Sequence, residues 1–208
     1  MDVSRIFEAL NDPQREAVGA PPGPILVLAG AGSGKTRVLT YRIAYLVQAL
    51  EVSPYSILAV TFTNKAANEM RKRIEDFLGF SVRGMWIGTF HGLSHRILRD
   101  HHELAGLPKG FEILDSDDQY RVIRRALKEL NLDEGYWPPR QIQWFINSQK
   151  EEGRRAAQVQ DNGDSHQQTL IRVYTHYEET CQRLGLVDFA ELLLRTLELL
   201  EQTPSLLD

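Results

Sequence analysis

The sequence is poor in cysteine and in long apolar runs. Cys181 is the single cysteine among 208 residues, so an internal disulfide is excluded and a reducing, cytosolic environment is the default expectation. The longest uninterrupted apolar run extends only from Ile25 to Ala29, whereas a membrane-spanning helix needs about 20 apolar residues. Residues 1–5 contain an acid where a secretory leader is basic, and no apolar stretch follows. These absences argue against a secreted or membrane-spanning protein.

An excess of positive charge is also missing. Lys and Arg number 24 against 28 Asp and Glu, a net charge of −4, which argues against a uniformly basic nucleic-acid binder. The charges are unevenly distributed, because residues 62–99 hold seven Lys or Arg against three Asp or Glu, whereas residues 178–208 hold two against seven. With 42% hydrophobic residues, the chain has enough apolar content to form a core. If it binds a polyanion, residues 62–99 are the expected place.

The first part of the chain, residues 1–89, alternates short apolar runs with helical patterns, which is typical of a parallel sheet covered by helices. Strands are predicted at 24–29, 56–61 and 85–88. Helices are predicted from Asn11 to near Gly19, from Lys35 onward, and from Asn64 to Gly79. The first strand is apolar on both faces, as in a central strand. Three strands give it few neighbours, so the sheet is expected to be incomplete within this chain.

The second part, residues 90–208, lacks the strand pattern and is predicted to form an all-helical subdomain. Capping-box sequences that begin at Ser116 and Ser165 each precede a helical pattern. The second of these helices is predicted to end at Gly185, and the polar stretch 153–165 is predicted to be a loop. The predicted fold is therefore an α/β unit followed by a helical unit.

The clearest functional motif lies between the first predicted strand and the next helix. It consists of Ala29, Gly30, Ala31, Gly32, Ser33, Gly34, Lys35 and Thr36, and it matches a phosphate-binding loop except that alanine replaces the usual leading glycine. Its three glycines allow positive φ and bring N–H groups close to phosphate oxygens, and the helix N-terminus favours an anion. The lysine is suited to terminal phosphates and the Thr36 hydroxyl to Mg²⁺. The motif predicts a nucleotide site on a partial P-loop NTPase sheet.

The second half of an ATPase site is missing from the sequence. Such enzymes need a short apolar strand that ends in Asp or Asp-Glu, which holds Mg²⁺ and activates water. The nearest sequences are Ile113-Leu114-Asp115 and Leu186-Val187-Asp188. Both apolar runs are too short, and both aspartates stand where N-capping of a helix explains them better.

Four segments, in the right order along the chain, resemble motifs of the UvrD/Rep/PcrA family of superfamily 1A DNA helicases. They are LNDPQREAV at 10–18, AVTFTNKAA at 59–67, GTFHG at 88–92 and GLVDF at 185–189. The resemblance implies that residues 1–89 are the front of a RecA-like motor domain (1A) and that 90–208 are the helical subdomain inserted into it (1B). It also implies that the acidic motif, the arginine fingers and a second motor domain belong to sequence beyond residue 208.

The resemblance assigns nucleotide contacts outside the phosphate loop. Gln14 matches the glutamine that reads the adenine edge, which an amide can do with two hydrogen bonds. Arg37 matches a position that lies against the base. From the residues alone, the favoured interpretation of Gln14 is an ordinary residue of an exposed helix face, and the alternative for Arg37 is an exposed helix charge.

The resemblance assigns DNA contacts to three segments. Phe62, Thr63, Asn64 and Lys65 match a motif that grips single-stranded DNA, with hydrogen bonds to phosphate and an aromatic ring for a base. Thr89, Phe90 and His91 match a second such motif after the third predicted strand. Phe189 matches an aromatic residue that stacks on a base, although a core position is an even alternative. A lone histidine such as His91 is also common as a structural residue.

The family resemblance implies an ATP-dependent 3′-to-5′ DNA helicase of the UvrD type that acts in nucleotide excision and mismatch repair. The expected cofactors are ATP and Mg²⁺, and the expected partners are single-stranded DNA, junctions of single- and double-stranded DNA, and other repair proteins, with no membrane. The expected location is the cytoplasm, at the nucleoid. With half a nucleotide site, the isolated chain is expected to be inactive. The alternatives are a non-catalytic nucleotide- and single-strand-binding module and a subunit of a helicase-nuclease; a small-molecule kinase is disfavoured.

Overall fold

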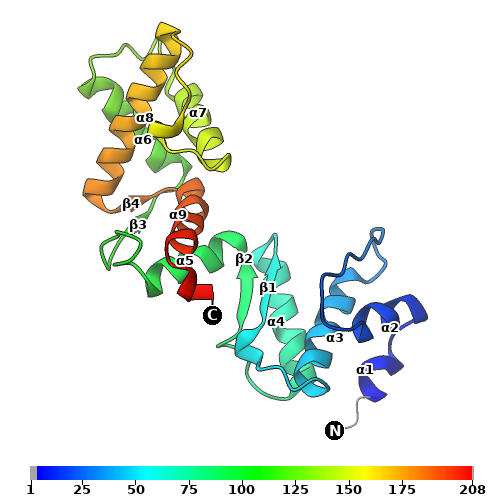
Figure 1. The fold of residues 1–208 in the computed structure, drawn as a ribbon. Coiled ribbons are helices and arrows are strands. Elements are labelled where there is room, and N and C mark those ends of the chain that lie inside the picture. The colour runs from blue at the N-terminus through cyan, green and yellow to red at the C-terminus, as the bar shows by residue number, and fades with distance from the viewer. Residues whose placement is uncertain (1–3, 208) are drawn as a thin grey trace. The chain divides into compact units, whose positions relative to one another are not determined.

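The computed structural model (Figure 1) describes residues 4–207, so part of the N-terminal segment used in the argument against a leader lies outside the described residues. Two compact units are formed, residues 1–93 and 94–208. Helix α5 (Phe90–Asp100) begins in the first unit and ends in the second. Among residues 4–207, no helix is both long and apolar enough to cross a membrane.

The first unit is a small parallel sheet with helices. Its elements are α1 (Ser4–Glu8), α2 (Asp12–Gly19), α3 (Lys35–Gln48), a 3₁₀ turn (Pro54–Ser56), β1 (Leu58–Thr61), α4 (Asn64–Leu78) and β2 (Trp86–Thr89). Strands β1 and β2 pair in parallel, with Leu58 opposite Trp86 and Thr61 opposite Thr89. Helix α4 packs on both strands and on α3. The larger of its two buried apolar clusters is made of these side chains: Ile43, Ile57, Ala59, Met70, Ile74, Val82, Met85 and Ile87.

Local signals account for the helix boundaries of this unit. The Asn11 side chain caps α2 by accepting from the Gln14 N–H at 3.0 Å, and Pro13 occupies the first turn. The Thr63 hydroxyl caps α4 by accepting from the Ala66 N–H at 3.1 Å. Helix α4 ends at Gly79, whose φ of 75° is the left-handed conformation expected of a C-terminal glycine. The predicted helices are confirmed here.

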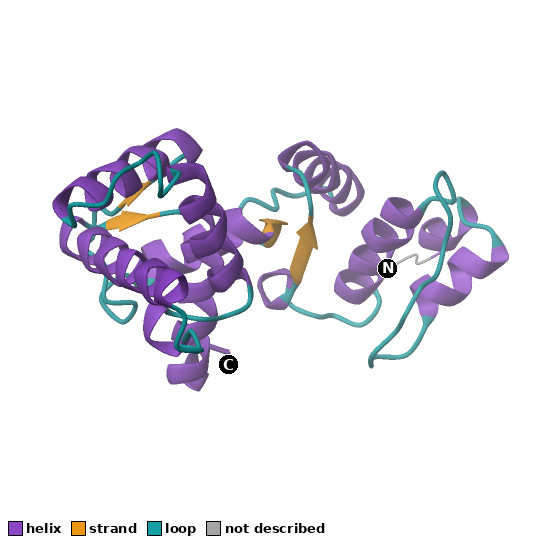
Figure 2. Ribbon diagram, turned by 90° about the horizontal axis from the view of Figure 1, so that it is seen from above, coloured by secondary structure: helices purple, strands orange, loops and turns teal. Residues whose placement is uncertain are grey.

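The strand predicted at 24–29 is wrong. The whole stretch between α2 and α3 is loop (Figure 2, teal). Leu26 is 83% exposed and Leu28 is 85% exposed. A strand forms only when a neighbour takes its hydrogen bonds and helices cover its faces, and the sheet described for this unit contains β1 and β2 alone. The apolar sequence is present, but a partner for it is not among the described residues.

The second unit is mainly helical and contains one very small sheet. After α5 its elements are β3 (Glu112–Ile113), α6 (Ser116–Glu129), α7 (Pro139–Glu151), a 3₁₀ turn (Ala156–Gln158), α8 (Ser165–Leu184), β4 (Leu186–Val187), α9 (Phe189–Gln202) and a 3₁₀ turn (Pro204–Leu207). Strands β3 and β4 pair in parallel. The all-helical prediction is therefore wrong in this detail, because a two-residue strand is too short to produce an alternating pattern.

The N-caps of α6 and α8 lie one residue before the serines that begin the two capping-box sequences, whereas the N-capping expected of Asp115 and Asp188 is confirmed. Helices α6 and α8 begin at Ser116 and Ser165, but their N-caps are Asp115 and Asp164, whose carboxylates accept from N–H groups of the first turn. A carboxylate adds a charge interaction with the helix dipole that a hydroxyl lacks. These N–H bonds also hold the pKa of Asp115 below its ordinary value. Helix α8 ends at Gly185 with φ of 67°, as predicted.

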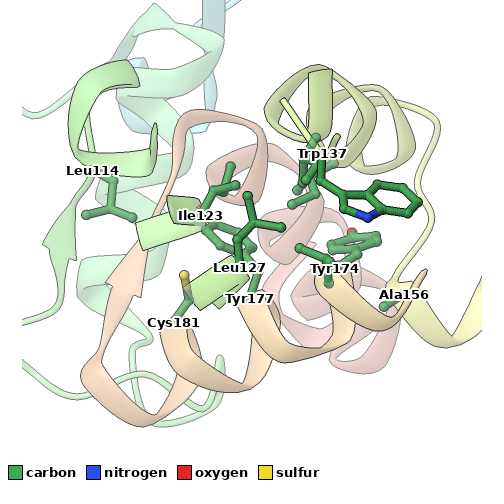
Figure 3. Close-up of a cluster of buried hydrophobic side chains, with 11 residues drawn as sticks. Leu114, Ile123, Leu127, Trp137, Ala156, Tyr174, Tyr177 and Cys181 are labelled. Carbon is green, nitrogen blue, oxygen red and sulfur yellow. The ribbon is translucent and has the colours of Figure 1, made fainter. Parts of the chain in front are cut away.

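Two kinds of interaction hold the second unit together. An apolar cluster from α6, α7, α8 and the segments beside them contains Leu114, Ile123, Leu127, Trp137, Ile142, Ile146, Ala156, Val173, Tyr174, Tyr177 and Cys181 (Figure 3). Beside it lies a buried ion network. The Lys150 ammonium, with a side chain only 2% exposed, lies 2.7 Å from Asp188 Oδ2 and 2.9 Å from Glu191 Oε2. Arg155 and Arg195 also pair with Glu191.

The charges of this network stabilise one another. Burial alone lowers the pKa of Lys150, but the Asp188 and Glu191 carboxylates outweigh it and raise the pKa above its ordinary value. Burial alone raises the pKa of Glu191, but Lys150 and the two arginines hold it below its ordinary value. Lys150 is on α7 and both carboxylates are at the start of α9 or before it. The network therefore ties these two helices together.

Candidate functional site

The glycine-rich loop at residues 29–36 leads directly into helix α3. Gly34 is the N-cap of this helix with φ of 88°, and Gly32 has φ of 76°. The positive φ that the three glycines allow is found at Gly32 and Gly34 but not at Gly30. The Gly30 carbonyl instead points into the loop, where it accepts from the Ser33 hydroxyl at 2.7 Å. Helix α3 begins directly after the loop, and the N–H groups of its first turn favour an anion there.

The Lys35 ammonium lies over this loop. Its Nζ donates to the carbonyl oxygens of Ala29 at 2.9 Å and Gly30 at 2.7 Å. Thr36, the next residue, is exposed at the start of α3. The lysine is therefore held by two loop carbonyl oxygens and adds a full positive charge to the lining of the pocket at the start of α3. Such an arrangement of ammonium, N–H groups and hydroxyl fits a polyphosphate with a bound Mg²⁺.

A pocket of about 510 Å³ opens in front of the loop. It is lined by Gln14, Gly32, Ser33, Gly34, Lys35, Thr36, Arg37 and Arg73. Three of these side chains are cations and none is a carboxylate, so the lining favours an anionic ligand. The volume suits a small-molecule ligand. Glycines 30 and 32 leave open space around them, so a ligand can approach the backbone closely.

Arg73 is the one residue of this pocket that the sequence reasoning missed. It stands in the middle of α4 and forms an ion pair with Glu69 one turn earlier. In the sequence this spacing is typical of an ordinary surface pair on a helix. Only the packing of α4 against α3 brings the guanidinium to the loop. Arg37, by contrast, lies on α3 itself and donates to the Ala9 carbonyl at 3.4 Å.

Gln14 connects helix α2 to the loop. Its Nε2 donates to the Ser33 carbonyl at 3.0 Å. Its Oε1 accepts from the Asn11 N–H at 3.2 Å, which completes a capping box. A Cβ atom at Gly34 would lie 2.7 Å from this Nε2, so a glycine is needed for such a close approach. The side chain assigned to the nucleotide by resemblance therefore lies at the pocket.

A second group of predicted residues gathers at the carboxyl end of the sheet. Strands β1 and β2 end opposite each other at Thr61 and Thr89, so the segments that follow them are neighbours. The Thr89 hydroxyl lies 3.4 Å from Asn64 Oδ1. The rings of Phe62 and Phe90 have their centroids 6.3 Å apart with an interplanar angle of 55°. The structure brings together two segments that are more than twenty residues apart in the sequence.

The exposure of this group is unusual for aromatic residues. Phe62 is 91% exposed and Phe90 is 53% exposed, whereas large apolar side chains are ordinarily buried. Lys65 and His91 are exposed beside them. Thr63 caps α4, as the capping alternative predicted, and its hydroxyl proton remains available for donation. Polar groups, a cation and two exposed aromatic rings thus lie together at the carboxyl end of the sheet in the first unit.

Phe189 belongs to the second unit. It is the first residue of α9, directly after the N-cap Asp188, and it is 51% exposed. The alternative that it is a core residue of this helix therefore does not hold, because core positions such as Leu192 are 1% exposed.

The first unit is thus an α/β module with a cation-lined pocket at its glycine-rich loop and an aromatic, polar edge at the end of its sheet. The chain belongs to the UvrD/REP helicase N-terminal domain family, whose model matches residues 10–208. It is 60% identical over 207 residues to DNA helicase II of Escherichia coli K12 and 54% identical over 211 residues to DNA helicase II of Haemophilus influenzae. It is 45% identical over 211 residues to ATP-dependent DNA helicase PcrA of Leuconostoc citreum. These matches cover the whole chain but only 28–29% of each relative, and the resemblance predicted from the sequence is confirmed.

Proposed function

We propose that this chain is the ATP- and DNA-binding front part of an ATP-dependent DNA helicase of the UvrD type. The observation that carries the proposal is the pocket at the glycine-rich loop, with three cations and no carboxylate in its lining. The names of the relatives, DNA helicase II and ATP-dependent DNA helicase PcrA, support the same activity for the intact protein.

In this proposal the loop N–H groups and Lys35 hold the phosphates of ATP, and the Thr36 hydroxyl is a ligand of Mg²⁺ that arrives with the nucleotide. When bound, ATP would supply the phosphoryl group that is transferred to water, and Mg²⁺ would neutralise charge on the phosphates. The chain itself binds and orients the triphosphate through the loop and places Gln14 and Arg37 at the base. Arg73 contributes a further cation to the same pocket. Because the sequence contains no Asp-Glu strand for the metal, the isolated chain is proposed to have negligible ATPase and unwinding activity.

Single-stranded DNA is proposed to bind along the edge formed by residues 62–65 and 89–91. Open aromatic rings provide stacking surfaces for bases, and Lys65 with the polar side chains provides contacts to phosphates. Phe189 is proposed to contribute a further stacking position. For the intact protein, the family resemblance supports movement in the 3′-to-5′ direction, action at single- and double-strand junctions with other repair proteins in excision and mismatch repair, and a location at the nucleoid in the cytoplasm.

Nucleotide binding is tested by calorimetric titration of the chain with ATP and Mg²⁺. Lys35→Ala should abolish measurable binding, because it removes the charge closest to the phosphates. Lys72→Ala is the matched control, since Lys72 is exposed on α4 and does not line the pocket. Equal affinity of the wild type and Lys35→Ala would contradict the proposal.

DNA binding is tested by fluorescence anisotropy with a labelled single strand. Phe62→Ala combined with Lys65→Ala should weaken binding by at least about fivefold, since stacking on one base contributes about 1–3 kcal/mol. Binding should also weaken steeply with salt. The matched control is Phe80→Ala combined with Lys72→Ala, because Phe80 is also exposed, at 47%. Equal affinity of the two double variants for the single strand would contradict this DNA site, whether the chain is part of a helicase or a non-catalytic binding module.

A further inference from the structure

The N-cap of α9 differs from the other aspartate caps of the second unit. Asp115 and Asp164, which cap α6 and α8, are exposed, whereas Asp188 is only 2% exposed. Its Oδ1 makes the ordinary capping bond, because it accepts from the Glu191 N–H at 2.7 Å. Its Oδ2 instead contacts side chains of other helices. Phe189, the exposed ring proposed to stack on DNA, is the next residue of the chain.

Donors from three neighbouring helices hold this buried oxygen. Asp188 Oδ2 accepts from Lys150 Nζ on α7 at 2.7 Å and from the Tyr177 hydroxyl on α8 at 2.7 Å. The Gln119 amide on α6 donates to the same oxygen at 3.3 Å. The Lys150 ammonium also lies 2.9 Å from Glu191 Oε2. Lys150 therefore contacts both the N-cap of α9 and the third residue of its first turn.

The physical chemistry of such a network favours a role in fixing geometry. Buried charges lose their hydration, and replacement of a buried ion network by apolar residues of similar volume is often neutral or stabilising. A network whose groups are all satisfied does, however, make its surroundings rigid. Among residues 4–207, no buried side-chain nitrogen or oxygen lacks a hydrogen-bond partner. The network around Asp188 is therefore suited to hold the first turn of α9 in one arrangement.

We propose that Asp188 and Lys150 position Phe189 for DNA binding, because they fix the first turn of α9 and with it the direction of the exposed ring. This inference rests on the proposed stacking of Phe189 on a base of single-stranded DNA. Asp188 and Lys150 are positioning residues in this scheme and do not touch the DNA. A ring on a frayed helix end would have to be ordered when the DNA binds, and that ordering lowers the affinity.

Lys150→Met combined with Asp188→Ser is the variant that releases this turn. Serine is a preferred N-cap residue, but it lacks the second carboxylate oxygen to which Tyr177 and Gln119 donate. Methionine also removes the contact of the ammonium with Glu191. The two substitutions together take away one buried charge of each sign, so they do not leave Lys150 or Asp188 as an uncompensated charge.

The matched control is Asp164→Ser combined with Lys128→Met. It makes the same two changes at exposed positions, the N-cap of α8 and the outer face of α6. Each double variant of the 208-residue chain is prepared with and without Phe189→Ala, and circular dichroism checks that all of them are folded. Fluorescence anisotropy then measures the affinity for a labelled single strand. The factor by which Phe189→Ala weakens binding gives the contribution of the ring in each background.

The expected result is that the ring contributes only when the network is intact. Phe189→Ala should weaken binding by at least about fivefold in the wild type and in the control. In Lys150→Met with Asp188→Ser, it should weaken binding by less than about twofold. A merely structural network would leave this factor unchanged, so equal factors in the two double variants overturn the inference. Wild-type affinity in the Phe189→Ala single variant refutes the proposed stacking, and the positioning with it.

A second measurement needs no variant and decides the question if Lys150→Met with Asp188→Ser does not fold. The N–H groups of Glu191 and Gln167 are each three residues beyond an aspartate cap and donate to it, at 2.7 Å and 3.3 Å. Corrected for intrinsic rates, amide hydrogen exchange at Glu191 should be at least about tenfold slower than at Gln167, because the network prevents opening of the turn. A smaller difference means that the first turn of α9 frays like an exposed helix end, and it overturns the inference.

Discussion

Replacement of Lys150 by methionine should destabilise the second unit severely. The ammonium is buried between Asp188 Oδ2 and Glu191 Oε2, at 2.7 Å and 2.9 Å, and Tyr177 also donates to Asp188 Oδ2 at 2.7 Å. Methionine fills a similar volume, so loss of packing is a small part of the effect. The main cost is that two carboxylates stay buried with fewer cations around them. Removal of one partner of a buried ion pair costs about 3–5 kcal/mol.

The assay is urea unfolding followed by tryptophan fluorescence in a Trp86→Phe background. Trp137 and Trp144 then report on the second unit alone, since both lie within residues 94–208. With a denaturant dependence of about 1–3 kcal/mol per molar urea, the midpoint should fall by about 2 M. Lys128→Met, on an exposed position of α6, should leave the midpoint unchanged.

A double variant separates the charge effect from packing. Lys150→Met combined with Asp188→Asn removes one buried charge of each sign, so it should recover part of the stability lost in the single variant. A loss of less than about 1 kcal/mol in Lys150→Met would refute the reasoning, because that is the value of an exposed pair. A double variant that is less stable than the single one would show that packing or hydrogen bonding, and not charge, is the dominant cost.

Three further outcomes concern the same unit. The pKa of Glu191 is lower in the folded chain than its ordinary value of 4.5, so the stability that Glu191 contributes is present above that pH and is lost on acidification below it. The free energy of unfolding in urea, measured between about pH 6 and pH 3, should therefore depend less on pH in Glu191→Gln than in the wild type. Gly185→Ala should lower the free energy of unfolding by more than about 2 kcal/mol, because the φ of Gly185 is 67° and a Cβ would lie 2.5 Å from Pro108. Gly153→Ala is the control and should cost about 1 kcal/mol, since Gly153 has a φ of 77° but open space around it. Equal losses of stability in the two variants would contradict a role for the Pro108 contact. Burial raises the pKa of Cys181 to about 12, so the thiol should react with a disulfide reagent only at the rate at which the chain unfolds. Rapid labelling of Cys181 in the native chain would contradict its burial.

Several helices and many of their ends were predictable from the sequence. A helix satisfies its hydrogen bonds within a few residues, so the signals that start and stop it are also local. The caps at Asn11 and Thr63 and the left-handed glycines 79 and 185 are examples. The strands at β1 and β2 were found as well, because each is a short apolar run between two helical patterns.

Features that depend on distant partners required the tertiary structure. The apolar segment 24–29 has the composition of a central strand, but the absence of a paired neighbour among the described residues leaves it as loop. Arg73 joins the loop pocket only because α4 packs on α3. The roles assigned to the site residues remain predictions, although the structure places Phe62 beside Phe90 and Gln14 against Ser33.

The sequence by itself determined several of the helices, the glycine-rich loop and the membership of the helicase family, because each depends on residues that are close together or on motifs in a fixed order. The tertiary structure decided which apolar run became a strand, which charges were buried, and which way the Gln14 amide points. Sheet pairing, ion pairing and amide orientation all depend on groups brought together by folding, so they cannot be predicted from a local pattern in the sequence.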